Sequence, residues 1–137
     1  MARVPLIQED SDPDLAELIG RIKAGRRGSL LNIYKLLLHS PEVTQAWMGL
    51  IDAIRANTVL DGRSRELAIL RVAAVNRSAY EIKQHVPRIA LSMGLTLEDC
   101  DAVAAWPAAL KLSEKDEAVI AYADAVTRDV HVEEAVV

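Results

Sequence analysis

The sequence contains no phenylalanine and only one cysteine, Cys100, among its 137 residues. A single cysteine cannot form an intramolecular disulfide, so a secreted scaffold held together by disulfides is excluded. Aromatic residues make up only 4% of the chain, which is too few for a platform on which nucleic-acid bases stack. The core must therefore be built from Ala, Leu, Ile and Val, and this composition favours closely packed helices over sheets.

Long hydrophobic runs are also absent. The longest, LAIL and VAAV on either side of Arg71, fall far short of a membrane span. The net charge is −4, so no overall positive field attracts nucleic acid. The first residues, MARVPLIQEDSDPD, lack the basic and apolar pattern of a signal peptide. We expect a cytoplasmic protein that binds neither a membrane nor nucleic acid.

The chain nevertheless has enough apolar material to fold by itself. Its composition is 51% hydrophobic and 26% charged, which is too apolar for a disordered segment. A length of 137 residues suits one compact domain with a real core. We therefore predict an irregular arm over residues 1–12 and a single domain over residues 13–137.

Helix start signals recur along the chain, whereas strand patterns are weak. Asp12-Pro13 and Ser40-Pro41 each combine a capping side chain with a proline at the first helical position. Gly94 is a predicted helix end, and Pro87 should kink the helix that contains it. The predicted helices begin at Pro13, Ser29, Pro41, Arg63, Ser78, Thr96 and Ser113. An all-α bundle of about seven helices is the predicted fold.

The segment NRSAYEIKQH, residues 76–85, combines a serine, a glutamate and a histidine. Ser78, Glu81 and His85 are spaced i, i+3 and i+7, so they share one helix face. The preceding helix carries Glu66 near its start. A short connection makes these two helices antiparallel neighbours, so Glu66 should reach His85 rather than Ser78.

The segment RELAILRVAAVNRSAYEIKQHVPRIALSMGLT resembles the carboxymuconolactone decarboxylase and alkylhydroperoxidase-D superfamily. The similarity runs through about residues 29–130, with its motif-bearing core at 62–96. In the peroxidase branch the pattern is Glu, eleven residues, Cys-x-x-Cys, three residues, His. Here Glu66 and His85 keep their places, and Ser78 and Glu81 stand at the two cysteine positions. The resemblance implies the helical fold of that superfamily and a homo-oligomer, a trimer or hexamer.

Replacement of both cysteines changes the expected chemistry. Thiol peroxidases need a thiolate nucleophile and a second thiol to resolve it. Serine has a far higher pKa than a thiol, and glutamate cannot form a disulfide. Cys100 lies outside the motif and has no partner cysteine. Thiol peroxidase activity is therefore not expected at this site.

The decarboxylase branch, as the resemblance implies, works without the cysteine pair and retains an acid and a histidine. Glu66, Glu81 and His85 are the predicted catalytic set, with His85 moving a proton and a glutamate orienting it or acting as base. Loss of CO₂ also needs a cation near the carbonyl, and Arg71 and Arg88 are the candidates. We expect a cofactor-free lyase or isomerase acting on a small carboxylated or lactone-type metabolite.

Each of these residues also has a structural interpretation. Ser78 can cap its helix, and Tyr80, which could place its hydroxyl in a substrate pocket, can instead pack its ring. Arg71 can pair with a glutamate in the core rather than hold substrate. Glu81 and His85 alone would form an ordinary surface pair at i, i+4.

Other functions stay open. Glu66, Glu81 and His85 together could bind iron or zinc, but the second histidine usual for such sites is missing nearby, so we expect no metal. The chain could be a peroxidase-related protein with a degenerate redox site, or one that acts through Cys100. It could also be a non-catalytic module that binds a ligand or assembles with copies of itself.

Overall fold

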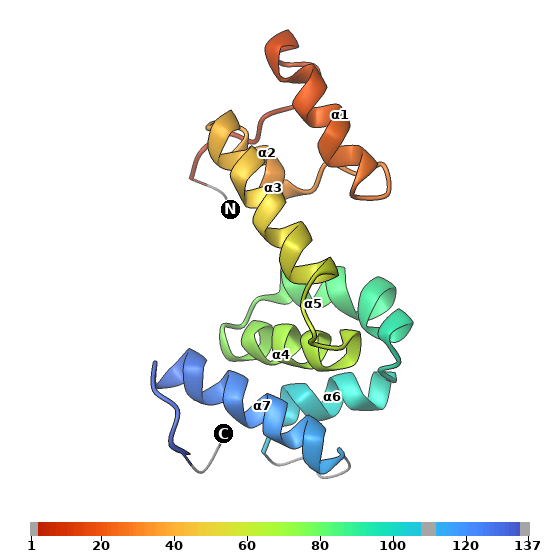
Figure 1. Cartoon of the computed structure of the whole chain (residues 1–137), viewed down its shortest axis with the longest axis vertical. Helices are drawn as coiled ribbons and strands as arrows, with labels where there is room; N and C mark the ends of the chain where they lie inside the picture. The colour runs from red at the N-terminus through yellow and green to blue at the C-terminus, as the bar shows by residue number, and fades with distance from the viewer. Residues whose placement is uncertain (1–2, 108–111, 135–137) are drawn as a thin grey trace. The chain divides into compact units, whose positions relative to one another are not determined.

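A computed structural model describes residues 3–107 and 112–134 of the chain, and over these residues it is helical without any strand (Figure 1). The α-helices are α1 (Ala16–Ala24), α2 (Asn32–Leu37), α3 (Pro41–Ala56), α4 (Gly62–Val75), α5 (Ala79–His85), α6 (Leu97–Ala105) and α7 (Glu114–Arg128). The predicted all-α fold of about seven helices is confirmed. None of the described helices is long and apolar enough to cross a membrane.

Two compact units divide the chain, Met1–Val59 and Leu60–Val137. The first contains α1 to α3, and the second contains α4 to α7 and every candidate site residue. The single domain over residues 13–137 stays a prediction, because two compact units can still unfold as one. The homo-oligomer stays a prediction too, since one chain is described.

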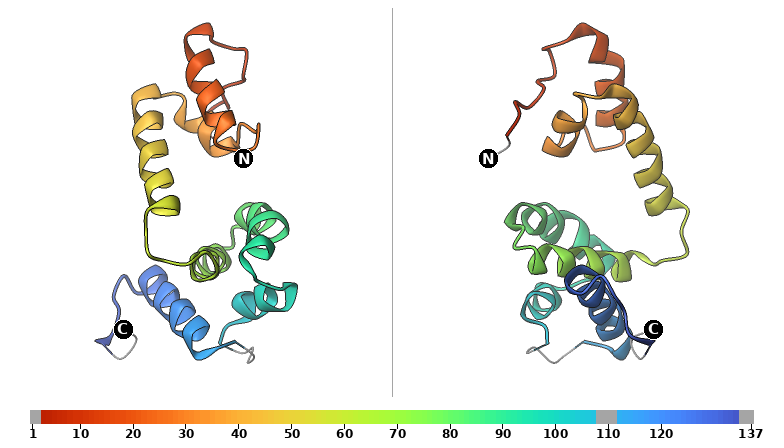
Figure 2. Two further views of the ribbon diagram at one scale, coloured as in Figure 1. Left: turned by 45° about the vertical axis from the view of Figure 1, so that its right-hand side comes forward. Right: turned by 90° about the vertical axis from the view of Figure 1, so that its left-hand side faces the viewer.

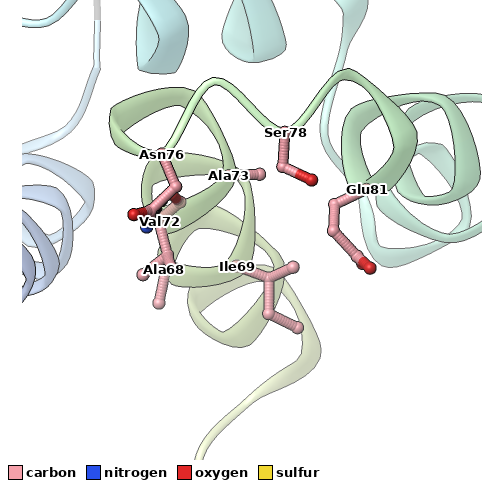
Figure 3. A pocket seen from close by; sticks show the side chains of 7 residues that line it. All are labelled: Ala68, Ile69, Val72, Ala73, Asn76, Ser78 and Glu81. Atoms are coloured by element: carbon pink, nitrogen blue, oxygen red, sulfur yellow. Dashed lines mark hydrogen bonds between the residues drawn. The ribbon is translucent and has the colours of Figure 1, made fainter. Parts of the chain in front are cut away.

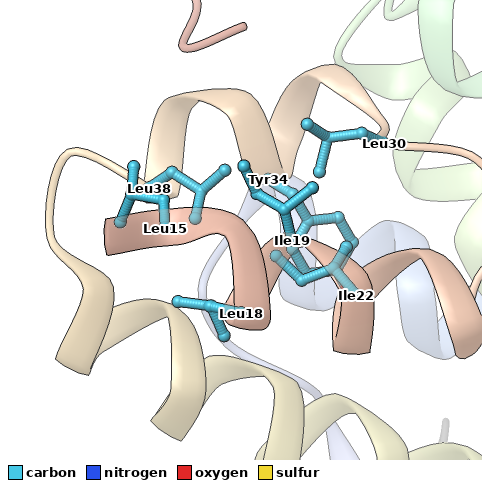
Figure 4. Close-up of a cluster of buried hydrophobic side chains, with 7 residues drawn as sticks. All are labelled: Leu15, Leu18, Ile19, Ile22, Leu30, Tyr34 and Leu38. Atoms are coloured by element: carbon cyan, nitrogen blue, oxygen red, sulfur yellow. The ribbon is translucent and has the colours of Figure 1, made fainter. Parts of the chain in front are cut away.

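The first unit packs around an aliphatic cluster (Figure 4). Its buried members are Leu15, Leu18, Ile19, Ile22, Leu30, Tyr34 and Leu38. As predicted, Asp12 begins the first helical segment, because its carboxylate accepts a hydrogen bond from the backbone N–H of Asp14 at 3.0 Å. The predicted helix start at Ser29 is wrong: α2 begins at Asn32. The chain is extended at Leu31, and Leu30 just before it is buried in the core.

Helix α4 is the centre of the second unit, and α5, α6 and α7 all contact it (Figure 2). Leu67 and Leu70 of α4 are buried against Val103 of α6 and Ile120 of α7. The start of α4 is fixed by Asp61, whose carboxylate accepts from both the backbone N–H and the hydroxyl of Ser64. The helix that supplies Glu66 is thereby held in place from its first turn.

The caps predicted for the last two helices are present. Thr96 and Asp99 form a reciprocal capping box at the start of α6. The Ser113 hydroxyl accepts from the backbone N–H of Asp116 at the start of α7, at 3.2 Å. These short polar motifs are local, so the sequence alone is enough to locate them.

The helix predicted over residues 78–93 is not continuous. It divides into α5, a π-helical turn over Val86–Ala90 and a 3₁₀ turn over Leu91–Met93, before Gly94 ends it with a left-handed φ of 86°. Pro87 explains the break, because it has no N–H and its ring cannot follow the α-helical path. A π turn accommodates such an interruption by widening one turn. His85 is thus the last α-helical residue before the bend.

Arg63 in the first turn of α4 ties together the starts of three helices. Its guanidinium donates to the Asp116 carboxylate, with contacts at 2.9 and 3.2 Å, and to Asp99 at 3.1 Å. A further N–H donates to the carbonyl of Gly94 at 2.8 Å. The Arg63 side chain lowers the pKa of Asp116 despite the opposing effect of burial. Burial also opposes the shift of Asp99, but bonds from Thr96 and Arg63 outweigh it, so its pKa is lowered too.

We predict that Arg63→Ala lowers the free energy of unfolding by about 1–2 kcal/mol at neutral pH, as expected for a partly exposed charged network. Because both carboxyl pKa values are lowered by folding, this stabilisation is complete above the unfolded pKa of about 3.9 and is lost as the pH falls through the folded values. Urea unfolding of the parent and the variant across an acidic pH series measures the difference.

Arg128→Ala is the matched control, since Arg128 makes an exposed i, i+4 pair with Asp124 that should contribute only about 0.3–0.5 kcal/mol. An Arg63→Ala protein as stable as this control at neutral pH would contradict the role of the network.

Candidate active site

Helices α4 and α5 supply the residues of the candidate site. A short loop joins them: Asn76 ends α4, Arg77 takes a left-handed φ of 54°, and Ser78 precedes α5. The backbone N–H of Ser78 donates back to the carbonyl of Ala73 at 2.8 Å. The tight reversal places the start of α4 beside the end of α5, which is the arrangement that the loop length predicts.

Glu66 and His85 form a buried hydrogen-bonded pair. The distance from His85 Nδ1 to Glu66 Oε2 is 2.6 Å. His85 is 6% exposed and Glu66 is 2% exposed. A buried carboxylate needs such a partner, because an unpaired charge in the interior is strongly destabilised. In the tautomer in which Nδ1–H donates to Glu66, the second ring nitrogen, Nε2, is the one that can exchange a proton.

Glu81 lies on the other side of the imidazole. Its Oε2 is 3.6 Å from His85 Nε2, which is within ion-pair range but longer than a hydrogen bond. The Glu81 side chain is 48% exposed, so solvent reaches its carboxylate. The three predicted catalytic residues thus follow one another, with the ring of His85 between a buried and an exposed carboxylate.

An open groove of about 480 Å³ runs along α4 and reaches Glu81 (Figure 3). Its lining residues are Ala68, Ile69, Val72, Ala73, Asn76, Ser78 and Glu81. Glu66 and His85 are not among them, so Glu81 separates the buried pair from the groove. Of the three predicted catalytic residues, Glu81 is therefore the one that lines the groove.

Ser78 and Tyr80 are placed differently. Ser78 occupies the N-cap position of α5, as its structural interpretation predicts, but its side chain makes no capping hydrogen bond. Instead its hydroxyl points into the groove toward Glu81 (Figure 3). Tyr80 is 41% exposed and does not line this groove.

The two arginines predicted to contact substrate do not reach the groove. Arg71 is buried and donates to the Asp124 carboxylate of α7 at 2.7 Å and to the carbonyl of Val103 at 3.1 Å. The structural interpretation of Arg71 therefore fits its surroundings, with an aspartate as its partner rather than a glutamate. Arg88 is exposed on the π-helical turn.

Sequence reasoning missed the apolar wall of the groove. Ala68 and Val72 lie one helical turn apart on α4, and Ile69 and Ala73 repeat the same spacing beside them. A stripe at this spacing is usually buried in the core, yet Val72 is 40% exposed. The only sequence signal was that α4 carries apolar residues on more than one face.

No metal centre is evident in the described part of the chain. Across residues 3–107 and 112–134, no group of three or more histidine, cysteine, aspartate or glutamate side chains is arranged to hold a metal ion.

Cys100 is separate from this site. It is 9% exposed and faces a smaller cavity of about 150 Å³ on the other side of α4, beside Leu70 and Ala74. Burial raises the pKa of its thiol, and the nearby carboxylates of Asp99 and Asp101 add to the effect. A buried thiol with a raised pKa is a poor nucleophile.

We predict that Cys100 of the folded protein reacts with a disulfide reagent such as Ellman's reagent at least about tenfold more slowly than in the unfolded protein, because the thiolate is rare and shielded. Absorbance stopped-flow measurements with and without denaturant give the two rates. Equal rates would show that Cys100 is an accessible, reactive thiol and would reopen the redox hypothesis.

We also predict that the neutral ring of His85 carries its proton on Nδ1, because Glu66 accepts from that atom. Long-range ¹H–¹⁵N spectra of labelled protein distinguish the two tautomers, and His85→Gln identifies the signal among the three histidines of the chain. The preference should weaken in Glu66→Ala. A neutral ring protonated on Nε2 in the parent protein would contradict the arrangement.

Comparison with known proteins supports the family assignment. The carboxymuconolactone decarboxylase family matches residues 41–125, which is more than half of the chain and contains every candidate residue of the site. No curated protein matches the chain, and no solved structure does. The chain belongs to the carboxymuconolactone decarboxylase family.

Proposed function

We propose that this protein is a cofactor-free lyase or isomerase that moves protons on a small carboxylated or lactone-type metabolite. The observation that carries the proposal is the spatial order of three acid–base groups, which from the groove inward are Glu81, His85 and Glu66. A buried carboxylate holding an imidazole, which in turn faces a second carboxylate at a groove, is suited to general acid–base catalysis.

Each residue has a distinct role in this proposal. Glu81, which lines the groove, takes a proton from the carbon next to a substrate carbonyl, and the C–H electrons stay on the substrate as an enolate. His85 accepts the proton from Glu81 through Nε2 and returns it through Glu81 to the new position on the substrate. Glu66 fixes the tautomer of the ring and stabilises the imidazolium that forms, so it acts through His85.

The same groups serve a decarboxylation. The C–C electron pair left by departing CO₂ stays on the substrate carbon, and protonated His85, through Glu81, supplies the proton that neutralises it. Both reactions are redox-neutral and need no thiol, which agrees with Ser78 and Glu81 at the two cysteine positions and with the buried state of Cys100.

Exchange of substrate protons with solvent tests the proposal before the natural substrate is identified. A panel of small lactones and carboxylated lactones is incubated with the protein in D₂O, and loss of the proton next to the carbonyl is followed by ¹H NMR. We predict that Glu81→Gln, His85→Gln and Glu66→Gln each reduce the enzyme-dependent exchange rate by about 10²–10⁴-fold, the usual contribution of a positioned acid or base.

Glu133→Gln is the control, because Glu133 is exposed and lies outside the site. Site variants that exchange protons as fast as this control would refute the proposed chemistry. Compounds that bind without any exchange would instead favour the non-catalytic ligand-binding module.

A further inference from the structure

The groove is better suited to bind an uncharged molecule than an anion. We propose that the substrate of this site is an uncharged, largely apolar carbonyl compound such as a lactone without a carboxylate, and that Glu81 excludes carboxylated analogues. The inference rests on the proposed function, and it narrows the two substrate classes named there to one.

The charge of the lining residues is the first argument. Glu81 is the only acidic or basic side chain among them. The rest of the wall is aliphatic, formed by Ala68, Ile69, Val72 and Ala73, apart from two neutral polar side chains at the loop (Figure 3). A carboxylate placed in this groove would lose water without gaining a cation, and it would be repelled by Glu81.

The positions of the neighbouring cations are the second argument. Arg71 directs its guanidinium away from the groove, to Asp124 and to the carbonyl of Val103. Arg63 is bound by Asp99, Asp116 and the carbonyl of Gly94. Arg77, next to Ser78 in the chain, is exposed and does not line the groove. None of these three arginines is placed to hold the carboxylate of a substrate.

The hydroxyl of Ser78 is the third argument. It points into the groove, it does not cap α5, and it lies on the same side as Glu81 (Figure 3). The amide of Asn76 instead donates to the carbonyl of Val72 at 2.9 Å. Ser78 is thus placed to donate a hydrogen bond to a neutral carbonyl oxygen while Glu81 meets the proton on the adjacent carbon.

The choice of substrate decides the reaction. An uncharged lactone has no carboxylate to lose as CO₂, so the proton that leaves one carbon returns to another. Glu81 takes the proton, the electron pair moves into the enolate, the enolate oxygen accepts from the Ser78 hydroxyl, and reprotonation at a different carbon moves the double bond. Atoms and charge balance without an external oxidant or reductant, and the enzyme is an isomerase.

A matched pair of probes tests the proposal by binding. One probe is a butenolide with a propyl side chain, and the other is the same butenolide with a carboxylate at the end of that chain. Dissociation constants are measured by ligand-observed NMR with the parent protein. We expect the parent to bind the uncharged probe about tenfold more tightly, as one like charge at short range in a wet groove would produce.

Variants identify the residue responsible. Glu81→Gln should reduce the preference to less than about threefold by improving binding of the acid, since the repulsive charge is gone. Glu133→Gln should keep the full preference. Arg77→Gln should keep it as well, whereas weaker binding of the acid in this variant would show that Arg77 holds a carboxylate and would overturn the proposal.

The outcomes also separate this proposal from the general one. Preferential binding of the uncharged probe without proton exchange would leave the substrate preference standing and remove the proposed catalysis. Proton exchange on the carboxylated probe alone would support the proposed catalysis and overturn the substrate preference. Equal or tighter binding of the acid to the parent protein, or binding of neither probe, overturns the present proposal.

Discussion

The hydrogen bond between Glu66 and His85 is the interaction around which the second unit is organised. Glu66 is almost completely buried on α4, so its carboxylate needs a hydrogen-bond partner, and the ring of His85 at the end of α5 supplies one. Arg71 on the same helix poses the same problem with opposite charge, and Asp124 of α7 solves it. Since Glu66 and Arg71, both buried on α4, have partners on different helices, the packing of α5 and α7 is specified by polar matching as well as by the aliphatic core.

Much of this arrangement can be predicted from local sequence. Asp12, Thr96 and Ser113 mark helix starts because a capping hydrogen bond involves only residues two or three apart. The meeting of Glu66 with His85 is predictable because a short loop fixes two helices as antiparallel neighbours. The helix start predicted at Ser29 is wrong although serine is a common capping residue. The chain is extended just after it, where Leu30 is buried, and α2 begins only at Asn32.

Other features depend on distant parts of the chain and leave no local signal. Arg71 and Asp124 are separated by 53 positions, and several acidic residues had equal claim to be the partner. The groove also has no local sequence signal. An aliphatic stripe on α4 predicts burial, and only the packing of the remaining helices decides which part of that stripe stays open. To predict the order of Glu81, His85 and Glu66 from the groove inward, one would need to know both the geometry of the loop and the burial of His85 and Glu66.

The π-helical turn after His85 also affects the charge of the site. In a regular helix, residue 88 lies one turn beyond residue 85 on the same face, so Arg88 would approach the imidazole and its two glutamates. Pro87 prevents that continuation, and the wider turn carries Arg88 round to solvent. Pro87, which neither ionises nor donates a backbone hydrogen bond, therefore affects where the charged side chain after it lies. In this chain the backbone, through one proline, helps to set the charge around the Glu66–His85 pair.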